Sequence, residues 1–179
     1  MSERTLLNYI TFPTPIGWIA ISASAEGICR IDFCGSNAPS QDVITNNLQE
    51  LFPFFELDSE AHQAMLDNTN TAIFNYFFEQ TPLPAIPLDI RSATAFQKDV
   101  WQSLCQIPFG ETRSYSEIAR NVGKPKAARA VGQACGKNPI PLIIPCHRVI
   151  SQNGRLGGFS SGLGIKKALL KLENVRFSP

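Results

Sequence analysis

The sequence has few groups that could hold a metal. It has only two histidines, His62 and His147, and none of its five cysteines forms a Cys-x-x-Cys pair. Structural zinc sites take four cysteine and histidine ligands, which typically come in closely spaced pairs. The ligands in this chain are too few and too scattered for that pattern, so we expect no metal site.

Long apolar runs and targeting signals are also missing. No stretch of about 18 uninterrupted apolar residues exists, and the first residues lack a basic region followed by an apolar run. We therefore expect neither a membrane span nor a secretory signal. Without export, the cysteines are expected to be reduced thiols in the cytoplasm.

Basic residues are scarce in the first half and acidic residues are scarce in the second. Residues 1–90 hold two basic and eleven acidic residues, a net charge of −9, whereas residues 91–179 hold fourteen and four, a net charge of +10. This asymmetry indicates two domains, one of which meets a polyanion. An acidic domain docked on a basic one is the alternative, but it does not explain why basic residues cluster within 120–137. The charge therefore favours nucleic-acid binding.

The first half reads as a small meander followed by helices. Apolar and β-branched runs separated by glycine-containing turns predict antiparallel strands, and apolar residues at helical spacing predict two helices whose phenylalanines lie in the core. The strands are expected at 9–12, 18–22 and 28–33, and the helices around 43–52 and 66–78.

A proline-rich segment follows these helices. Residues 81–87 contain three prolines, which can continue neither a helix nor a strand. We interpret it as the linker between an N-terminal domain at 1–87 and a second domain at 88–179.

The second half opens with a helix beginning near Ser92 or Thr94, and then two short helices joined by a tight turn. Ser114 and Glu117 match a capping box, and Pro125 suits the first turn of a following helix that ends at Gly136. This order is typical of a helix-turn-helix, although an ordinary helical hairpin has the same pattern. The basic residues favour DNA; they are Lys124, Lys126, Arg129 and Lys137.

The second of these helices is unusual for a base-reading helix, because it carries one long side chain among small ones. Arg129 stands among Ala127, Ala128, Ala130 and Gly132. Small residues let the backbone approach the duplex and leave the arginine to project. We expect this helix to read DNA shape and insert a side chain, not to read base edges one by one.

The stretch PCHRV places a nucleophile beside a base. Cys146 needs a base or a positive environment to ionise, and His147 could be that base. Neighbouring side chains on a strand point apart, so either the backbone turns there or a water bridges the two. Glu173 could hold the imidazole in the right tautomer. A buried structural cysteine with a packing histidine remains the alternative reading.

The last third of the chain contains a turn, a loop and a helix. Asn153-Gly154 is a strong hairpin signal, and after a helix-turn-helix it suggests a wing. A glycine-rich loop over 157–162 and a final helix over 163–172 follow.

Taken together, GETRSYSEIA, GKPKAARAVGQACGKNPIPLIIPCHRVI, NGRLGGFSSGL and KKALLKLE resemble the O6-alkylguanine-DNA alkyltransferases over residues 92–173. The resemblance implies an α+β fold. A small N-terminal α/β domain, ribonuclease-H-like and serving as structural support, would precede a mostly helical, winged helix-turn-helix-like domain.

The resemblance also implies a mechanism that begins with base flipping. Arg129 would fill the space left by the flipped nucleotide, and the small face of the helix would lie in the minor groove. Tyr115 would promote the rotation and assist proton transfer to the departing guanine. Cys146 would attack the alkyl carbon, His147 would deprotonate it through a water, and Asn138 would brace its turn. The base would sit in a pocket formed by Pro141, Val149, Phe159 and Ser160.

The thioether product has no easy leaving group, so the protein is expected to act once and to need no cofactor. Its partner would be double-stranded DNA that contains O6-alkylguanine, with O4-alkylthymine as a second substrate. We expect a monomer that could bind cooperatively along DNA. Phe159 stands where the family usually has tyrosine, and we expect activity to be retained.

Two other functions are open to such a chain. A catalytically silent relative would bind alkylated DNA without repairing it, but it would lack the cysteine of the motif. A cysteine hydrolase built on Cys146, His147 and Glu173 would leave Arg129 and the +10 half without a role.

Overall fold

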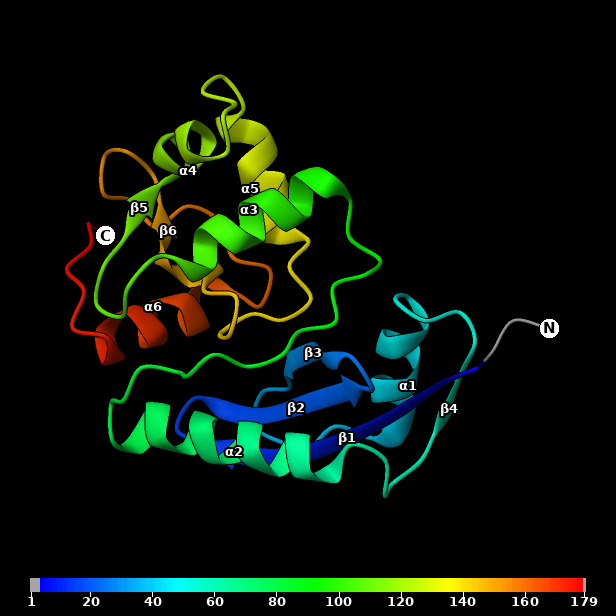
Figure 1. Cartoon of the computed structure of the whole chain (residues 1–179). Coiled ribbons are helices and arrows are strands. Elements are labelled where there is room, and N and C mark those ends of the chain that lie inside the picture. The colour runs from blue at the N-terminus through cyan, green and yellow to red at the C-terminus, as the bar shows by residue number, and fades with distance from the viewer. Residues whose placement is uncertain (1–3, 179) are drawn as a thin grey trace. The chain divides into compact units, whose positions relative to one another are not determined.

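The structure, a computed structural model, describes residues 4–178. The chain divides between Ser92 and Ala93 into two compact units, called unit 1 and unit 2 below and drawn with their elements in Figure 1. No helix within the described residues is both long and apolar enough to cross a membrane.

Unit 1 is built on a four-stranded sheet in the order β3-β2-β1-β4. Its strands are β1 Thr5–Thr14, β2 Gly17–Ser24, β3 Gly27–Phe33 and β4 Phe55–Leu57. The first three pair antiparallel, which confirms the expected meander, and β4 adds a parallel edge beside β1. Gly17 permits the tight first turn, because its φ is +117° and a Cβ there would lie 2.5 Å from the Gly35 carbonyl oxygen.

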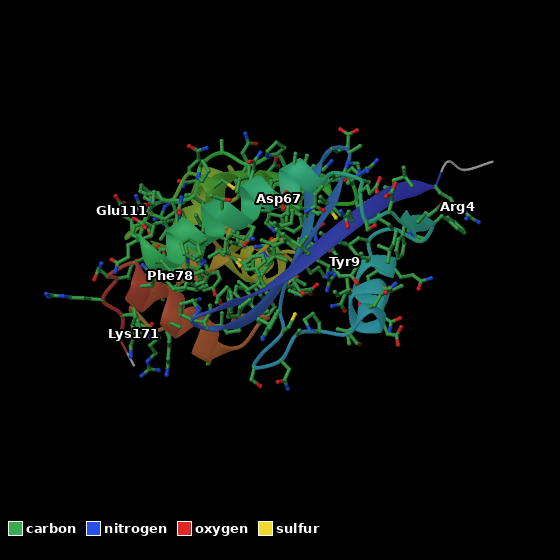
Figure 2. All side chains as sticks on the ribbon, turned by 90° about the horizontal axis from the view of Figure 1, so that it is seen from below. Arg4, Tyr9, Asp67, Phe78, Glu111 and Lys171 are labelled. Atoms are coloured by element: carbon green, nitrogen blue, oxygen red, sulfur yellow. The ribbon has the colours of Figure 1, made fainter. Side chains whose placement is uncertain are left out.

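Two helices complete unit 1: α1 Gln41–Gln49 and α2 Gln63–Phe78. Helix α2 runs along the sheet (Figure 1) and contacts all three antiparallel strands. The expectation that its phenylalanines all lie in the core was wrong. Phe77 is buried, but Phe74 and Phe78 are 53% and 57% exposed and stack on each other with their ring centroids 4.5 Å apart. Being four residues apart, they share one face of α2, and their exposure means that this face points away from the sheet; Phe78 is labelled in Figure 2.

The end of unit 1 differs from the expected boundary at residue 87. Residues 81–87 form no helix or strand, but the chain then pairs with β3. Ile28 donates its N–H to the Pro87 carbonyl, and Asp89 donates its own to the Ile28 carbonyl, each at 2.9 Å. The Asp89 carboxylate also accepts hydrogen bonds from Ser24 and Arg91. These bonds hold residues 87–91 to unit 1 and move the boundary to Ser92.

Unit 2 is mainly helical. Its helices are α3 Ala95–Cys105, α4 Tyr115–Asn121, α5 Ala128–Gly136 and α6 Leu163–Leu172; a 3-10 turn, η1, covers Cys146–Arg148, and the short strands β5 Arg113–Ser114 and β6 Val149–Ile150 pair in parallel. Capping boxes begin α3 at Thr94 and α4 at Ser114, which confirms both expected starts. The last helix has its expected bounds.

Helices α4 and α5 form the helix-turn-helix pair, but α5 begins later than expected. Lys124, Pro125 and Lys126 lie in the turn before it, and Ala127 donates its N–H to the Lys124 carbonyl. No side chain caps α5, because its N-cap residue is alanine. The helix ends at Gly136 as expected.

The expected hairpin at Asn153-Gly154 is a tight turn without paired strands. Gly154 has a φ of +77°, and Ser151 donates to the Arg155 carbonyl at 2.8 Å. The flanking residues pair elsewhere: β6 pairs with β5, and Arg155 pairs with Ser178. The wing is therefore a loop, because each arm of the hairpin has another partner.

Candidate active site

Cys146 begins the 3-10 turn η1, directly after Pro145. Its side chain is 3% exposed. The local backbone is thus a turn and not the strand in which neighbouring side chains would point to opposite faces. The backbone turn that the sequence left open is observed, and it is compatible with a water between the two side chains.

Asn138, two residues after α5, holds this turn in place. Its Nδ2 donates to the Ile144 carbonyl at 2.8 Å and to Cys146 Sγ at 3.2 Å, while its Oδ1 accepts the Ile140 N–H at 2.9 Å. One buried amide therefore connects the end of α5, the chain before the turn and the sulfur itself. A donor aimed at sulfur favours its anionic form.

His147 is fully buried beside the end of α6. Its Nε2 lies 2.8 Å from Glu173 Oε1. Because a carboxylate only accepts hydrogen bonds, Nε2 carries the proton, and Nδ1 is the acceptor in the neutral ring. Nδ1 is buried and has no protein hydrogen-bond partner among residues 4–178.

Glu173 is shared with Arg148. The guanidinium of Arg148 donates to both carboxylate oxygens, from Nε and NH2, at 2.9 Å, and its NH1 donates to the Ile107 carbonyl. The Gly110 N–H also donates to Glu173. A bidentate, fully bonded arrangement of this kind compensates a buried carboxylate, and it fixes the group that orients His147.

Burial governs the charge states of both reactive groups. It raises the pKa of the Cys146 thiol to about 11, against the hydrogen bond from Asn138 and the charge of Lys166, which lower it. Burial also lowers the pKa of His147, although Glu173 opposes this. His147 is therefore neutral in the resting protein and can accept a proton.

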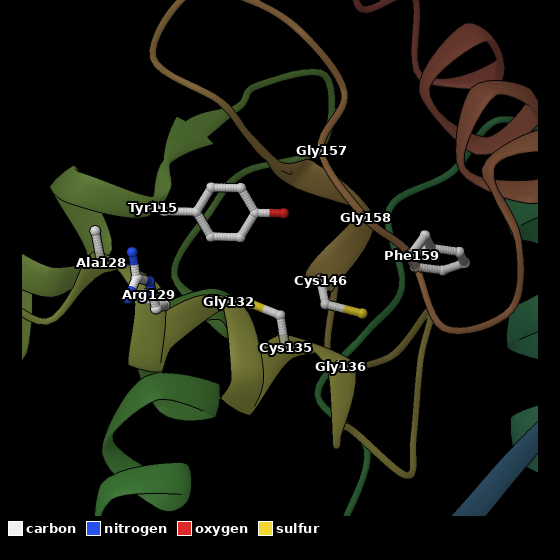
Figure 3. Close-up of a pocket in the computed structure, with 10 residues that line it drawn as sticks. All are labelled: Tyr115, Ala128, Arg129, Gly132, Cys135, Gly136, Cys146, Gly157, Gly158 and Phe159. Atoms are coloured by element: carbon white, nitrogen blue, oxygen red, sulfur yellow. The ribbon is translucent and has the colours of Figure 1, made fainter.

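A cavity of about 460 Å³ opens over Cys146. Figure 3 shows its walls, with Tyr115 on one side of the sulfur and Phe159 on the other. The residues that line it are Tyr115, Ala128, Arg129, Gly132, Cys135, Gly136, Cys146, Gly157, Gly158 and Phe159. Glycines, alanine and aromatic rings make the walls mainly apolar, as is usual for sites that take a flat organic ligand.

Tyr115 reaches the cavity from the first position of α4. Its ring lies over Gly132 of α5, and its hydroxyl lies over Gly157, where a Cβ would come within 2.7 Å of Oη. Burial, with smaller contributions from Cys135 and Cys146, raises the pKa of Tyr115 to about 12. The hydroxyl therefore keeps its proton and can donate it.

Arg129 lies at the cavity edge, on the exposed side of α5. It makes no hydrogen bond or ion pair with another of residues 4–178. Ala128 and Gly132 lie on the same stretch of helix and also line the cavity, whereas Ala127 and Ala130 do not.

Three residues expected at the pocket are not among those lining the cavity. Pro141 and Val149 are buried in the surrounding structure, and Ser160 is exposed in the glycine loop. The sequence reasoning missed Cys135, Gly136, Arg148 and Lys166. The sequence did contain a sign that Lys166 is buried, because this residue falls on the apolar face of α6 with Leu169 and Leu170.

The described part of the chain offers no evident set of ligands for a metal ion. Residues 4–178 contain no group of three or more histidine, cysteine or acidic side chains able to hold a metal ion.

Comparison with known proteins identifies both units. A family model described as 6-O-methylguanine DNA methyltransferase, ribonuclease-like domain, matches residues 7–90. A second, described as the DNA binding domain of the same enzyme, matches residues 95–175. The chain is 41% identical over 170 residues to a methylated-DNA–protein-cysteine methyltransferase of Methanosarcina acetivorans, covering 93% of this chain and 98% of the relative.

Solved structures agree. The Mycobacterium tuberculosis O6-methylguanine methyltransferase superposes with a TM-score of 0.76 at 35% identity, over 97% of this chain and 95% of the other. The OGT protein of the same organism, solved in complex with DNA, gives a TM-score of 0.74 at 34% identity, over 94% and 92%.

Proposed function

The chain belongs to the 6-O-methylguanine DNA methyltransferase family, and on that premise we propose that Cys146 accepts an alkyl group from O6-alkylguanine in DNA. The protein is a DNA-repair enzyme, a methylated-DNA–protein-cysteine methyltransferase that reverses the damage directly. The observation that carries the assignment to Cys146 is its position: a buried thiol, bonded by Asn138, at the base of an apolar cavity beside α5.

The proton of the thiol goes to His147. The neutral imidazole has its Nε2 proton held by Glu173 and its Nδ1 free of protein partners. A buried polar atom of this kind is usually bonded to a water, and such a water would carry the proton from Cys146 to Nδ1. The imidazolium formed is stabilised by Glu173, which Arg148 holds in place.

The sulfur then displaces guanine in one step. A bond forms between Sγ and the alkyl carbon while the bond from that carbon to O6 breaks, and guanine leaves with the electron pair. Tyr115 supplies a proton to the leaving base, since its hydroxyl is protonated and directed into the cavity (Figure 3).

The base must leave the duplex to reach a buried thiol. Arg129 occupies the vacated space, since it is exposed, unpaired within the described residues and at the cavity edge. Ala127, Ala128, Ala130 and Gly132 give α5 a small surface for a close approach to the minor groove. Pro141 and Val149, which are buried, support the pocket from behind its lining, and the exposed Ser160 follows Phe159 in the glycine loop.

The thioether formed on Cys146 is stable to water, so each molecule acts once, and no cofactor takes part. The substrate is double-stranded DNA with O6-alkylguanine, and O4-alkylthymine is a second substrate. The protein acts as a monomer, with cooperative binding along DNA as a further possibility to measure. We place the reaction in the cytoplasm, because the nucleophile has to remain a free thiol.

The test is intact mass after incubation with a duplex that contains one O6-methylguanine. We expect one added methyl group, mapped to Cys146 by peptide analysis and absent in Cys146→Ser. Methylation of another residue would overturn the assignment to Cys146. Repeated turnover would overturn the single-use mechanism, and release of a hydrolysed product would favour a cysteine hydrolase instead.

A further inference from the structure

Lys166 is a fully buried lysine on the apolar face of α6. Its Nζ donates to the Val149 carbonyl at 2.6 Å and to the Gly158 carbonyl at 3.3 Å. Val149 follows the turn that carries Cys146, and Gly158 lines the cavity. The ammonium group therefore lies behind the cavity wall, between the nucleophile's turn and the glycine loop.

Among the described residues, no carboxylate forms an ion pair with Lys166. The other buried cation of unit 2, Arg148, is compensated by Glu173. Burying an ammonium group whose hydrogen-bond partners are only carbonyl oxygens lowers the stability of the fold by several kcal/mol. Burial accordingly lowers the pKa of Lys166 to about 8, which leaves it mainly charged at neutral pH.

The groups that could carry a compensating negative charge are few. The Glu173 carboxylate is already engaged with His147 and Arg148. Burial raises the pKa values of Tyr115 and Cys135 to about 12. Cys146, whose pKa is raised less and whose sulfur accepts a hydrogen bond from Asn138, is the best place for that charge. Conversely, Cys146 and Cys135 both act to raise the pKa of Lys166.

We propose that the Lys166 ammonium is the buried charge that stabilises the Cys146 thiolate. The inference rests on the proposed function, since it takes Cys146 as the acceptor. Lys166 is a positioning residue: it gives and takes no proton and does not touch the substrate. His147 removes the thiol proton, and Lys166 lowers the energy of the anion that remains. Its two carbonyl bonds also keep the nucleophile's turn and the glycine loop at a constant separation.

The experiment measures thiolate reactivity without DNA. Iodoacetamide reacts with the thiolate, forming a bond from sulfur to carbon and releasing iodide. The rate of modification at Cys146 is followed by peptide mass from about pH 6 to about pH 10 in the wild type, Lys166→Met and Lys166→Arg. The matched control is Lys167→Met, which removes the exposed neighbouring lysine.

We expect Lys166→Met to slow the reaction roughly tenfold near neutral pH, which corresponds to about one pKa unit. The difference from the wild type should shrink above a pH of about 8, where Lys166 itself loses its charge. Lys166→Arg should keep most of the rate, and Lys167→Met should match the wild type.

Two results would overturn the inference: an unchanged rate in Lys166→Met, or a loss that is the same at every pH and therefore reflects only the lost carbonyl bonds. If Lys166→Met does not fold by circular dichroism, Lys166→Gln keeps side-chain donors without the charge and is judged by the same criteria. Methyl transfer from the O6-methylguanine duplex to wild-type Cys146 is measured in parallel. Its failure would refute the proposed function, whereas an unchanged iodoacetamide profile beside normal transfer would refute only the role of Lys166.

Discussion

The two units bury very different kinds of polar group. Among residues 4–92, unit 1 buries one charged side chain, Asp89, which is paired with Arg91. Unit 2 buries four ionisable side chains besides its thiols: His147, Arg148, Lys166 and Glu173. Buried ionisable groups reduce stability unless they are well paired, and they gather where chemistry requires shifted pKa values. On this comparison we propose that unit 1 gives structural support and that unit 2 carries the reaction.

Two buried thiols show the same contrast. Cys29 in unit 1 donates its S–H to the Ser22 carbonyl, and burial together with the nearby Asp89 raises its pKa to about 12. Cys146 in unit 2 instead accepts a hydrogen bond and has Lys166 as the nearby charge. Burial raises the pKa of both thiols, but Cys146 has a hydrogen-bond donor on its sulfur and, among the described residues, no carboxylate that opposes its ionisation, so its pKa is raised less than that of Cys29.

Net charge separates the units as well. Residues 1–92 hold three basic and eleven acidic residues, a net charge of −8, and residues 93–179 hold thirteen and four, a net charge of +9. The basic charge of unit 2 suits a DNA backbone, whereas the acidic charge of unit 1 disfavours non-specific contact with it.

The largest effect is expected from Glu173→Gln in unit 2. The change leaves Arg148 buried without its carboxylate and removes the group that orients His147. We expect methyl transfer to slow by about 10²–10⁴-fold and the free energy of unfolding to fall by about 3–5 kcal/mol, measured by single-turnover kinetics and denaturant titration. The matched control, Glu111→Gln, removes an exposed carboxylate and should change stability by less than about 1 kcal/mol. Equal effects of the two changes would contradict the special role of the buried cluster.

The next effect concerns Arg129→Ala, which separates DNA opening from chemistry within unit 2. Flipping a base requires a few kcal/mol, so repair of duplex DNA should slow by at least about tenfold while the reaction with the free base O6-benzylguanine stays nearly unchanged. Rates on the two substrates check this. As a control, Lys126→Ala changes a residue in the exposed turn before α5. It should lower the affinity for duplex DNA modestly and make that affinity slightly less dependent on salt concentration. Equal losses of Arg129→Ala on both substrates would rule out insertion.

In unit 1, Asp89→Asn should affect stability and leave the reaction intact. Burial acts to raise the pKa of Asp89, but hydrogen bonds from Arg91 and Ser24 outweigh it and hold the pKa below its ordinary value of 3.8. The ionised form therefore stabilises the fold above that pH, and the contribution is lost as the pH falls below 3.8. We expect Asp89→Asn to lower the free energy of unfolding by about 1–3 kcal/mol at neutral pH.

Denaturant titrations at several pH values check this, because the wild type and Asp89→Asn should converge on acidification. Methyl transfer by the folded variant should equal that of the wild type. A loss of transfer would show that unit 1 takes part in the reaction.

The smallest effect is expected from Phe159→Tyr. Phe159 forms an aromatic wall of the cavity, and a tyrosine keeps that wall and adds only a hydroxyl. The transfer rate from O6-methylguanine should change by less than about threefold, a difference below about 1 kcal/mol. Single-turnover kinetics on one duplex check this, and a larger loss would mean that the apolar wall is itself required.

Local signals predicted much of the fold. The antiparallel strands, the capping boxes at Thr94 and Ser114 and the bounds of α6 follow from residues close together in sequence. The predictions differed from the structure where hydrogen bonds to a segment distant in sequence decided the local conformation. Residues 87–91 join unit 1 because β3 offers them hydrogen bonds, and the predicted wing is a loop because β5 pairs with β6.

The candidate site divides in the same way. The sequence alone predicted the nucleophile, its neighbouring histidine and the small-residue helix, because they lie in nearby motifs whose residue types and family resemblance are visible without a structure. Only the tertiary structure decided how the charges are balanced. The contact of Glu173 with His147 was expected and is observed, but the sharing of Glu173 with Arg148 and the burial of Lys166 behind the cavity wall were not expected. Those relations depend on burial and on distances between separate elements, which no local pattern encodes.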